Sequence, residues 1–442
     1  MAGFLGPGFN SRRLHHVFVL GLQAPRYFRV NHKARSEALP SIQQAGMKVN
    51  AKILTWARTT AGLSPQQAAH ALGFNDTRQR TATECLEALE TGEEELSRSV
   101  LLKMAKAYRR SLLVFYLKEP PRAGDRGQDF RSVQGAESAL YDPLLDALIR
   151  DVRARQAIVR DVAQDTETKP LEFVGTASMD RPPLDLARRI SERLQFSLDE
   201  FRAQPTPEMA FNYLRRTIED AGIYVLLLGN LGSYHTKIPV EVFRGFAIAD
   251  PIAPFIVLND GDARTAWSFT ALHEAAHIWL GATGVSGESL DAQIEKYCND
   301  VAGEVLLPAG DLRTLQGVRA MPLAEAVEAI AAFAKLRKVS RAMVAYRLLR
   351  VNGISVGTWR QLAAHFREEW ITSRERDMTE KPEGGPSYYV LRRHRLGNAL
   401  VDFVRRTLAE GAISRTKAGQ VLGVKPRSVD PLIHGISAPE NR

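Results

Sequence analysis

The chain has 442 residues, of which 45% are hydrophobic and 25% charged, a composition typical of a globular protein. This length exceeds what one hydrophobic core usually serves, so we expect two or three domains. Only two cysteines occur, Cys85 and Cys298, and they lie far apart, which excludes a disulfide framework and suits a cytoplasmic location. No apolar run approaches the roughly 18 residues of a membrane span, so membrane contact is not expected.

The formal charge of +9 permits contact with nucleic acid without requiring it. Residues 47–120 hold 11 Lys and Arg against 8 Asp and Glu, whereas residues 387–442 hold 10 against 4. The tail is therefore the more basic end, and any contact with the phosphates of double-stranded DNA is expected to be strongest there.

The first part of the chain predicts an extension followed by a helical domain. Residues 1–46 show no lasting periodicity and are expected to be a disordered extension, so either Met1 or Met47 can be the start. Helices are expected over 51–60, after Ser64, over 83–90 and within 99–116. Ser64 can cap the second helix, with Pro65 in its first turn and Gln67 closing a capping box. This predicts a domain over 47–131.

Further along, the periodicity changes from helical to extended and back. Helical segments are expected around 142–164, 183–203 and 207–221, and residues 132–206 are expected to form a helical linker region. Short apolar runs at 223–228, 240–248 and 255–258 predict a small sheet. Helices follow at 264–280, 290–306, 323–336 and 340–351, giving a domain over 207–355. After these, a Pro- and Gly-rich linker at 382–386 lies within a helical module over 356–442. The expected fold class is α+β and mostly helical.

The pentapeptide His273-Glu274-Ala275-Ala276-His277 has the strongest chemical signal. On a helix, residues four apart lie on one face, about 6 Å apart along the axis. Two imidazoles so placed can bind one Zn²⁺, and Glu274 can act as general base on the water that the metal acidifies. The alternative is two histidines four apart by coincidence. The helix is otherwise mostly apolar, where ionisable groups are costly without a partner, so the metal is favoured.

A catalytic zinc site needs a third protein ligand, expected from the helix over 290–306. Glu295 can be that ligand, and Asn299, four residues on, can accept a hydrogen bond from the outer nitrogen of a ligand histidine. Glu304 is the rival ligand, but it stands nine residues from Glu295, half a turn away, so both cannot face one metal. We favour Glu295, with Glu304 as a solvated or structural carboxylate. Cys298 is interpreted as a small buried residue.

Several stretches together resemble the ImmA/IrrE family of zinc metallopeptidases. They are the pentapeptide, Phe243-Arg244-Gly245-Phe246, and residues 254–259, 294–308 and 339–348. Residues 112–121 and 129–131 resemble the subgroup with an N-terminal Xre-type helix-turn-helix. This resemblance, over about residues 47–355, implies that His273 and His277 are ligands, Glu274 the catalytic base and Glu295 the third ligand. It also implies a zincin-like, gluzincin-type protease domain in a protein that cuts a repressor or another regulator.

Two segments are candidate DNA-binding modules. In the first, Leu89 to Gly92 resembles the end of an Xre recognition helix, but the polar stretch 75–80 is longer than the usual turn. Glu84, Glu87 and Glu90 would also repel phosphate. DNA binding and protein interaction both stay open for this module. If it binds DNA, Arg78 and Arg80 are the more suitable contacts.

The tail is the second candidate module. Its small and apolar residues Ala418, Gly419, Leu422, Val429 and Leu432 have the register of a helix-turn-helix. The residues expected to contact phosphate are Arg415, Lys417, Lys425 and Arg427. Pro431 argues against a regular second helix, and the alternative is a helical pair that packs on the protease domain.

The sequence therefore predicts a zinc-dependent metallo-endopeptidase of gene regulation. One alternative is a DNA-binding regulator or antitoxin-like protein whose metalloprotease domain senses a partner without cutting it, and another is a zinc hydrolase acting on something other than peptide. Glu274 favours an enzyme over a docking protein, because metal binding or docking alone has no use for a general base.

Overall fold

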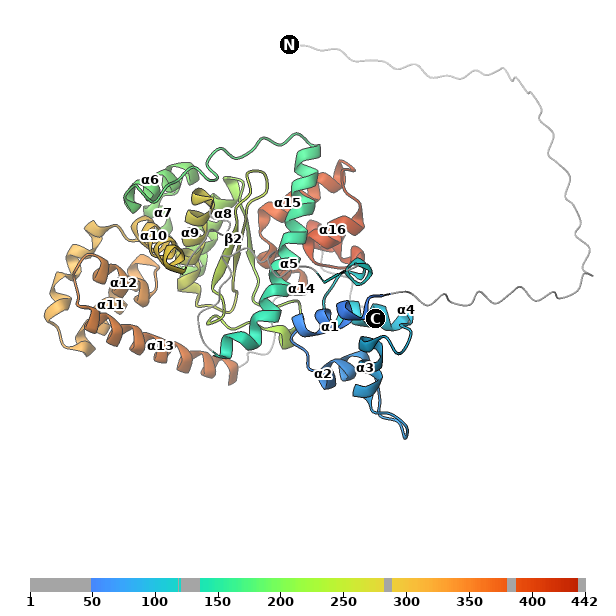
Figure 1. Cartoon of the computed structure of the whole chain (residues 1–442). Helices are drawn as coiled ribbons and strands as arrows, with labels where there is room; N and C mark the ends of the chain where they lie inside the picture. Colours follow the sequence, from blue (N-terminus) through green and yellow to red (C-terminus); the bar gives the residue numbers. More distant parts are fainter. Residues whose placement is uncertain (1–48, 118, 121–135, 282–287, 380–386, 436–442) are drawn as a thin grey trace, which may run out of the picture. The chain divides into compact units, whose positions relative to one another are not determined.

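The computed structural model describes residues 49–117, 119–120, 136–281, 288–379 and 387–435 (Figure 1). Within these residues the chain is mostly helical with one three-stranded sheet, so the expected α+β fold class is confirmed. The expected extension 1–46, the motif at 129–131 and the linker at 382–386 lie outside them. None of the helices in these ranges has both the length and the apolar character needed to cross a membrane.

Short helices near the start of the chain pack around a core of their own. They are α1 (Ala51–Thr60), α2 (Pro65–Leu72), α3 (Ala82–Thr91), α4 (Arg98–Ala107) and the 3₁₀ turn η1 (Leu112–Tyr116). The predicted capping box of α2 is confirmed, because the Ser64 hydroxyl accepts from the Gln67 N–H and the Gln67 side chain accepts from the Ser64 N–H. The helices expected within 99–116 are shorter than predicted, since α4 ends at Ala107 and Arg109 has a φ of 51°.

The next helices lead to the sheet. They are α5 (Ala136–Asp165), α6 (Pro183–Leu194), α7 (Leu198–Ala203) and α8 (Pro207–Asp220). The segment expected to be helical over 183–203 is in fact two helices. Gln195 ends α6 in the left-handed conformation, and the Ser197 hydroxyl caps α7 by accepting from the Glu200 N–H.

The sheet consists of β1 (Tyr224–Leu227), β2 (Gly245–Ile248) and β3 (Phe255–Leu258) in the order β1-β3-β2. The central strand β3 pairs parallel to β1 and antiparallel to β2. The strand expected over 240–248 is wrong in its first half. The N–H groups of Val242 and Phe243 donate to the Pro239 carbonyl in a turn, so extended structure begins only at Gly245.

Both faces of the sheet are covered. Val225 and Leu227 of β1 belong to a core shared with α8 and α9, whereas Leu226 belongs to a core shared with α5 and the C-terminal helices. Because side chains alternate along a strand, one short strand serves two cores. The C-terminal elements are α14 (Tyr388–Leu396), α15 (Asn398–Ala409), α16 (Arg415–Leu422), η5 (Pro426–Ser428) and α17 (Val429–His434).

The expectation that Pro431 prevents a regular helix in the tail is wrong. Pro431 lies in the first turn of α17, where the backbone N–H has no intrahelical partner and its loss costs little. The second helix nevertheless has only six residues.

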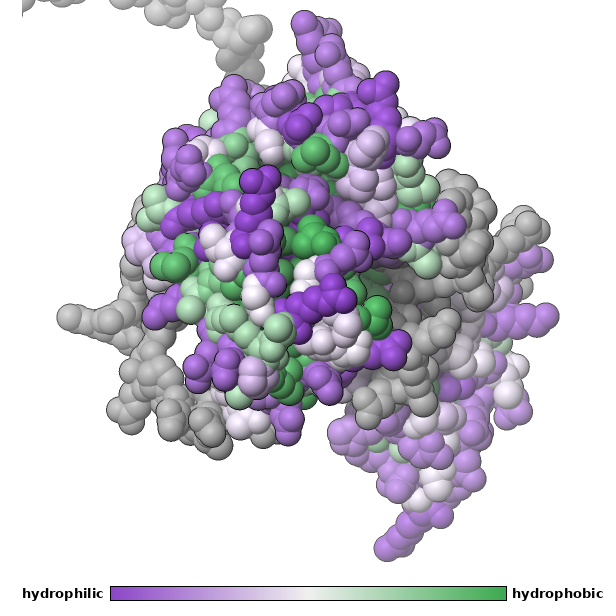
Figure 2. All heavy atoms as spheres, turned by 90° about the vertical axis from the view of Figure 1, so that its left-hand side faces the viewer, coloured by the Kyte–Doolittle hydropathy of each residue, from purple (hydrophilic) through white to green (hydrophobic). Residues whose placement is uncertain are grey.

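The remaining helices follow the sheet in the chain, and α10 to α13 lie on the left-hand side of Figure 1, which faces the viewer in Figure 2. They are α9 (Arg264–Leu280), α10 (Glu288–Leu306), η4 (Ala309–Ala320), α11 (Leu323–Arg337), α12 (Arg341–Arg350) and α13 (Val356–Thr379). Hydrophobic residues appear on this face in small areas between hydrophilic ones, and Leu336 is the most exposed large apolar side chain on α11, at 71%. Such scattered apolar exposure is ordinary for a protein surface.

Candidate metal centre

Helix α9 carries two histidines in an apolar setting. It packs against α8, α10 and the sheet, and most of its residues are buried on every side. His273 and His277 are each 8% exposed, one helical turn apart on the same face. A mostly apolar, well-packed helix therefore holds two imidazoles in fixed positions at the floor of a cleft.

The donor atoms of three side chains converge on one point. The Nε2 atoms of His273 and His277 are 3.1 Å apart, and the two carboxylate oxygens of Glu295 lie 3.1 and 3.2 Å from them. Two ligand atoms that each lie about 2.0–2.1 Å from a tetrahedral zinc are roughly 3.3 Å apart. The three side chains thus form a group that could hold a metal ion, and their separations fit a tetrahedral one.

Glu295 comes from α10, the helix that packs most extensively on α9. Burial raises the pKa of this carboxyl, but hydrogen bonds and attraction from His273 and His277 outweigh burial and bring the pKa well below its usual range. The carboxylate is therefore ionised at neutral pH, the state in which it can ligate a cation.

The rival carboxylate, Glu304, points elsewhere. Its Oε1 lies 2.7 Å from Nη2 of Arg347, a guanidinium buried on α12. Gly303 beside it leaves room for the Arg347 side chain, because a Cβ there would lie 2.6 Å from Arg347 Cδ. Glu304 therefore joins α10 to α12 and takes no part in the group formed by Glu295.

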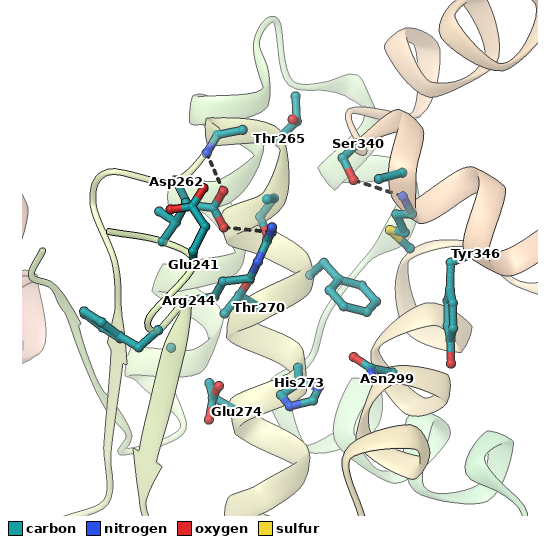
Figure 3. Close-up of a pocket in the computed structure, with 18 of the residues that line it drawn as sticks. Glu241, Arg244, Asp262, Thr265, Thr270, His273, Glu274, Asn299, Ser340 and Tyr346 are labelled. Carbon is teal, nitrogen blue, oxygen red and sulfur yellow. Dashed lines mark hydrogen bonds and ion pairs between the residues drawn. The ribbon is translucent and has the colours of Figure 1, made fainter. Parts of the chain in front are cut away.

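Glu274 lies on the side of α9 that faces the sheet, whereas His273 faces α10 (Figure 3). Its side chain is buried against Gly245, the first residue of β2. A Cβ at Gly245 would lie 2.9 Å from Oε1 of Glu274 and 2.8 Å from Cγ2 of Thr270. Only glycine therefore lets β2 approach the helix this closely.

Asn299, expected to accept a hydrogen bond from the outer nitrogen of a ligand histidine, does not do so at His273. Among the described residues, the Nδ1 of His273 has no hydrogen-bond partner. Asn299 is one helical turn after Glu295 on α10 and lines the cleft (Figure 3). Cys298 is fully buried, as predicted.

Residues 219–349 match the family model described as Peptidase_M78, IrrE N-terminal-like domain. This match supports the ImmA/IrrE resemblance and a metallopeptidase. It spans the sheet, α9, α10 and α12, and so includes all three converging side chains and Glu274. No curated protein and no solved structure matched the chain.

A cleft of about 790 Å³ opens over the candidate metal centre. Its floor is α9 and one wall is the segment 240–247 with β2. The facing wall is α12, which carries Tyr346 in Figure 3, together with α13. Sequence reasoning assigned no α13 residue to the site. The apolar residues Ala363, Phe366 and Trp370 are spaced along one helical face, which signals packing but does not reveal a cleft.

A polar cluster fixes α12 against α10 beside the cleft. The Tyr346 hydroxyl donates to Oδ1 of Asp300 at 2.9 Å, and Arg350 donates to both Asp300 oxygens at 2.7 and 2.6 Å. Burial beside the Asp300 carboxylate raises the pKa of Tyr346, so its hydroxyl stays protonated. Together with the Arg347 pair, these contacts hold the helix that carries Glu295.

Proposed function

We propose that the chain is a zinc-dependent metallo-endopeptidase of gene regulation that cuts a repressor or another regulatory protein in the cytoplasm. This proposal is carried by the convergence of His273, His277 and Glu295. The buried carboxylate of Glu274 lies on α9 with the two histidines. Two imidazoles and one carboxylate are a ligand set of catalytic zinc sites. The match to the IrrE N-terminal-like domain supports peptide-bond hydrolysis as the reaction.

In this proposal Glu274 is the general base. Zinc held by the three ligands would polarise the scissile carbonyl and acidify a water molecule. Glu274 takes the proton of the water as its oxygen attacks the carbonyl carbon, and it delivers that proton to the nitrogen as the C–N bond breaks. Packing against Gly245 holds the carboxylate in place, so little reorientation is needed during the transfer.

The edge of the sheet offers a place for an extended substrate. In the sheet order β1-β3-β2, strand β2 lies at one edge, and Gly245 brings that strand against Glu274. An extended peptide can add to an open strand edge through main-chain hydrogen bonds. A peptide bound along β2 would pass beside the general base, which suits an endopeptidase and a zincin-like domain.

A second candidate function is that of a DNA-binding regulator whose protease domain docks a partner without cutting. It is favoured by the exposed Lys425 and Arg427, which lie at the turn between α16 and α17. We assign an Xre-type helix-turn-helix to the N-terminal helices. Two of the three α3 carboxylates that would repel phosphate make contacts within this domain. Glu90 binds Arg58 at 2.7 Å, and Glu84 accepts from the Thr81 N–H.

Glu274→Gln separates the two functions. The change is nearly isosteric and replaces none of the three ligands, so the variant should keep its zinc but lose about 10²–10⁴-fold in cleavage rate. Proteins that accumulate in cells with this variant and disappear with the wild type would identify the substrate, whose fragments are then followed with purified protein. Glu328→Gln, on the exposed face of α11, is the control and should cleave normally. Equal cleavage by the Glu274 variant, or tight binding without fragments by the wild type, would support docking instead.

A further inference from the structure

The helix α13 lies outside the matched segment 219–349 and yet forms part of the cleft. Ala363, Phe366 and Trp370 of this helix line the cavity that contains His273 and Glu274. The metallopeptidase domain therefore shares its cleft with a wall that the family match does not include.

This wall is fixed by contacts from α12. Arg341 Nη1 lies 2.6 Å from Oε2 of Glu369, and its guanidinium lies 4.9 Å from the centre of the Phe366 ring. Phe366 is only 5% exposed and Leu362 is fully buried in the core shared with α12. The apolar face of α13 is thus held at the cleft as a packed surface.

The apolar part of the cleft lies close to the reacting centre. Phe269 is one turn before His273 on α9, about 6 Å along the helix axis, and the two ring centres are 6.5 Å apart. An extended peptide advances about 3.3 Å per residue, so this step corresponds to about two substrate residues. Phe269 and Met343 line the same cavity as the α13 residues.

Two ion pairs neutralise part of the charge at the rim. Arg341 is paired with Glu369, and Arg244 lies 3.2 Å from the Asp262 carboxylate. Two of the arginines that line the cavity are therefore engaged, and Phe269, Met343 and Phe366 contribute apolar side chains to its lining. Such a pocket discriminates by the volume and hydrophobicity of what enters it.

We propose that Phe269, Met343, Ala363, Phe366 and Trp370 form a side-chain pocket that selects substrates with a bulky apolar residue within about two positions of the scissile bond. The inference rests on the proposed endopeptidase function and names the substrate class of that same site. Its specificity depends on α13, so the matched segment alone would not provide it.

Ala363 and Ala364 offer a matched test. Ala363 lines the pocket, whereas Ala364 is its exposed neighbour on the same helix. The zinc-loaded full chain is incubated with a degenerate peptide library, and the cleaved positions are read by mass spectrometry. We expect Leu, Ile, Met or Phe to be enriched at one position beside the cut. Ala363→Trp should fill the pocket and lower the preference for bulky over small residues by about ten-fold or more, while Ala364→Trp should keep it.

A binding measurement separates this inference from the proposed function. Fluorescent peptides that differ only in Leu or Ala at the selected position are titrated against Glu274→Gln, alone and combined with Ala363→Trp, after equal zinc content and helicity have been verified. If the peptide with Leu binds more tightly and Ala363→Trp abolishes this preference, the pocket is supported even when the wild type cuts no peptide. Failure of the wild type to cut would then overturn only the proposed protease function. If the peptide library shows no enriched position, the same titration is carried out with peptides that have Leu or Ala at each position in turn. No preference in either assay, or a preference that Ala363→Trp leaves unchanged, overturns the pocket.

Discussion

At the scale of single residues, the candidate metal centre depends on which face of α10 each carboxylate occupies. Glu295 and Glu304 are nine residues apart, so a regular helix turns them to opposite sides. One reaches the imidazoles of α9 and the other pairs with Arg347 of α12. A metal bound by Glu295 would therefore tie α9 to α10 from the cleft side, while Glu304 ties α10 to α12 from the other.

Substitution of the ligands tests this assignment. Purified protein should hold about one zinc per chain, and His273→Ala or His277→Ala should lose most of it, because two remaining ligands bind zinc poorly. Glu295→Gln should weaken binding by more than the roughly 10–100-fold that loss of an outer-shell partner costs. The matched change Glu304→Gln should keep zinc affinity near that of the wild type. Metal analysis and chelator competition give the values, and the reverse order for the two glutamates would transfer the ligand role to Glu304.

Much of the donor group could be predicted from the sequence because it obeys helix geometry. The spacing of His273 and His277 and the opposition of Glu295 and Glu304 need only 3.6 residues per turn. The close approach of Gly245 to Glu274 could not be predicted in the same way, since it depends on how a strand packs on a distant helix. The missing hydrogen bond between Asn299 and His273 has the same origin, because helix geometry does not give the distance between two helices.

At the scale of elements, a buried ion pair on α8 joins the ends of two other helices. Glu219 Oε2 accepts from the N–H groups of Asn398 and Ala399 at 3.1 and 3.3 Å, at the start of α15, which has no side-chain cap of its own. Arg215 pairs with Glu219 and donates to the His394 carbonyl at 2.5 Å, near the end of α14. Each charge thus lies at the helix end whose dipole it complements.

Glu219→Ala should therefore destabilise the chain more than an ordinary surface change. It leaves the buried Arg215 without a counter-charge and uncaps α15, and removal of one partner of a buried pair costs about 3–5 kcal/mol. Asp220→Ala, at the exposed neighbouring position, should change the free energy of unfolding by less than about 0.5 kcal/mol. Urea denaturation of both variants measures the difference. Equal stability of the two would show that the α14–α15 junction is held by other contacts.

The boundaries of elements could be predicted where the signal is local. Ser64 and Gln67 mark the start of α2, and α9 has the bounds expected from its apolar pattern. The segment 240–244 reads as a strand because Val and Phe favour extended structure, but the turn after Pro239 prevails. The positive φ of Gln195 and of Arg109, each at the end of a helix, could not be predicted from the residue type, since glycine is the usual residue there.

At the scale of the whole chain, the C-terminal helices complete the covering of the sheet. Val421 and Leu422 of α16 belong to the same core as Val257 of β3 and Val152 of α5. The α16–α17 pair therefore packs on the sheet core, as one of the two alternatives expected. Packing does not exclude DNA contact, because Lys425 and Arg427 remain exposed at the turn of the pair. Deleting the C-terminal module would expose this core to solvent. The role of the positive charges of the module in DNA binding is therefore better tested by substitution.

DNA binding by this module can be tested with two charge-matched double variants. Lys425→Gln with Arg427→Gln removes two positive charges at the turn between α16 and α17, and Arg405→Gln with Arg406→Gln removes two from the exposed face of α15. Each phosphate contact contributes about −0.9 to the slope of log affinity against log salt concentration. If the turn contacts phosphate, the first variant should lower the magnitude of that slope by nearly two, while the second should change it little. The slope is measured by fluorescence anisotropy of a labelled duplex over a range of salt concentrations. Equal slopes for the wild type and the first variant would leave the exposed lysine and arginine as solvated residues of a helical pair that serves only to cover the sheet.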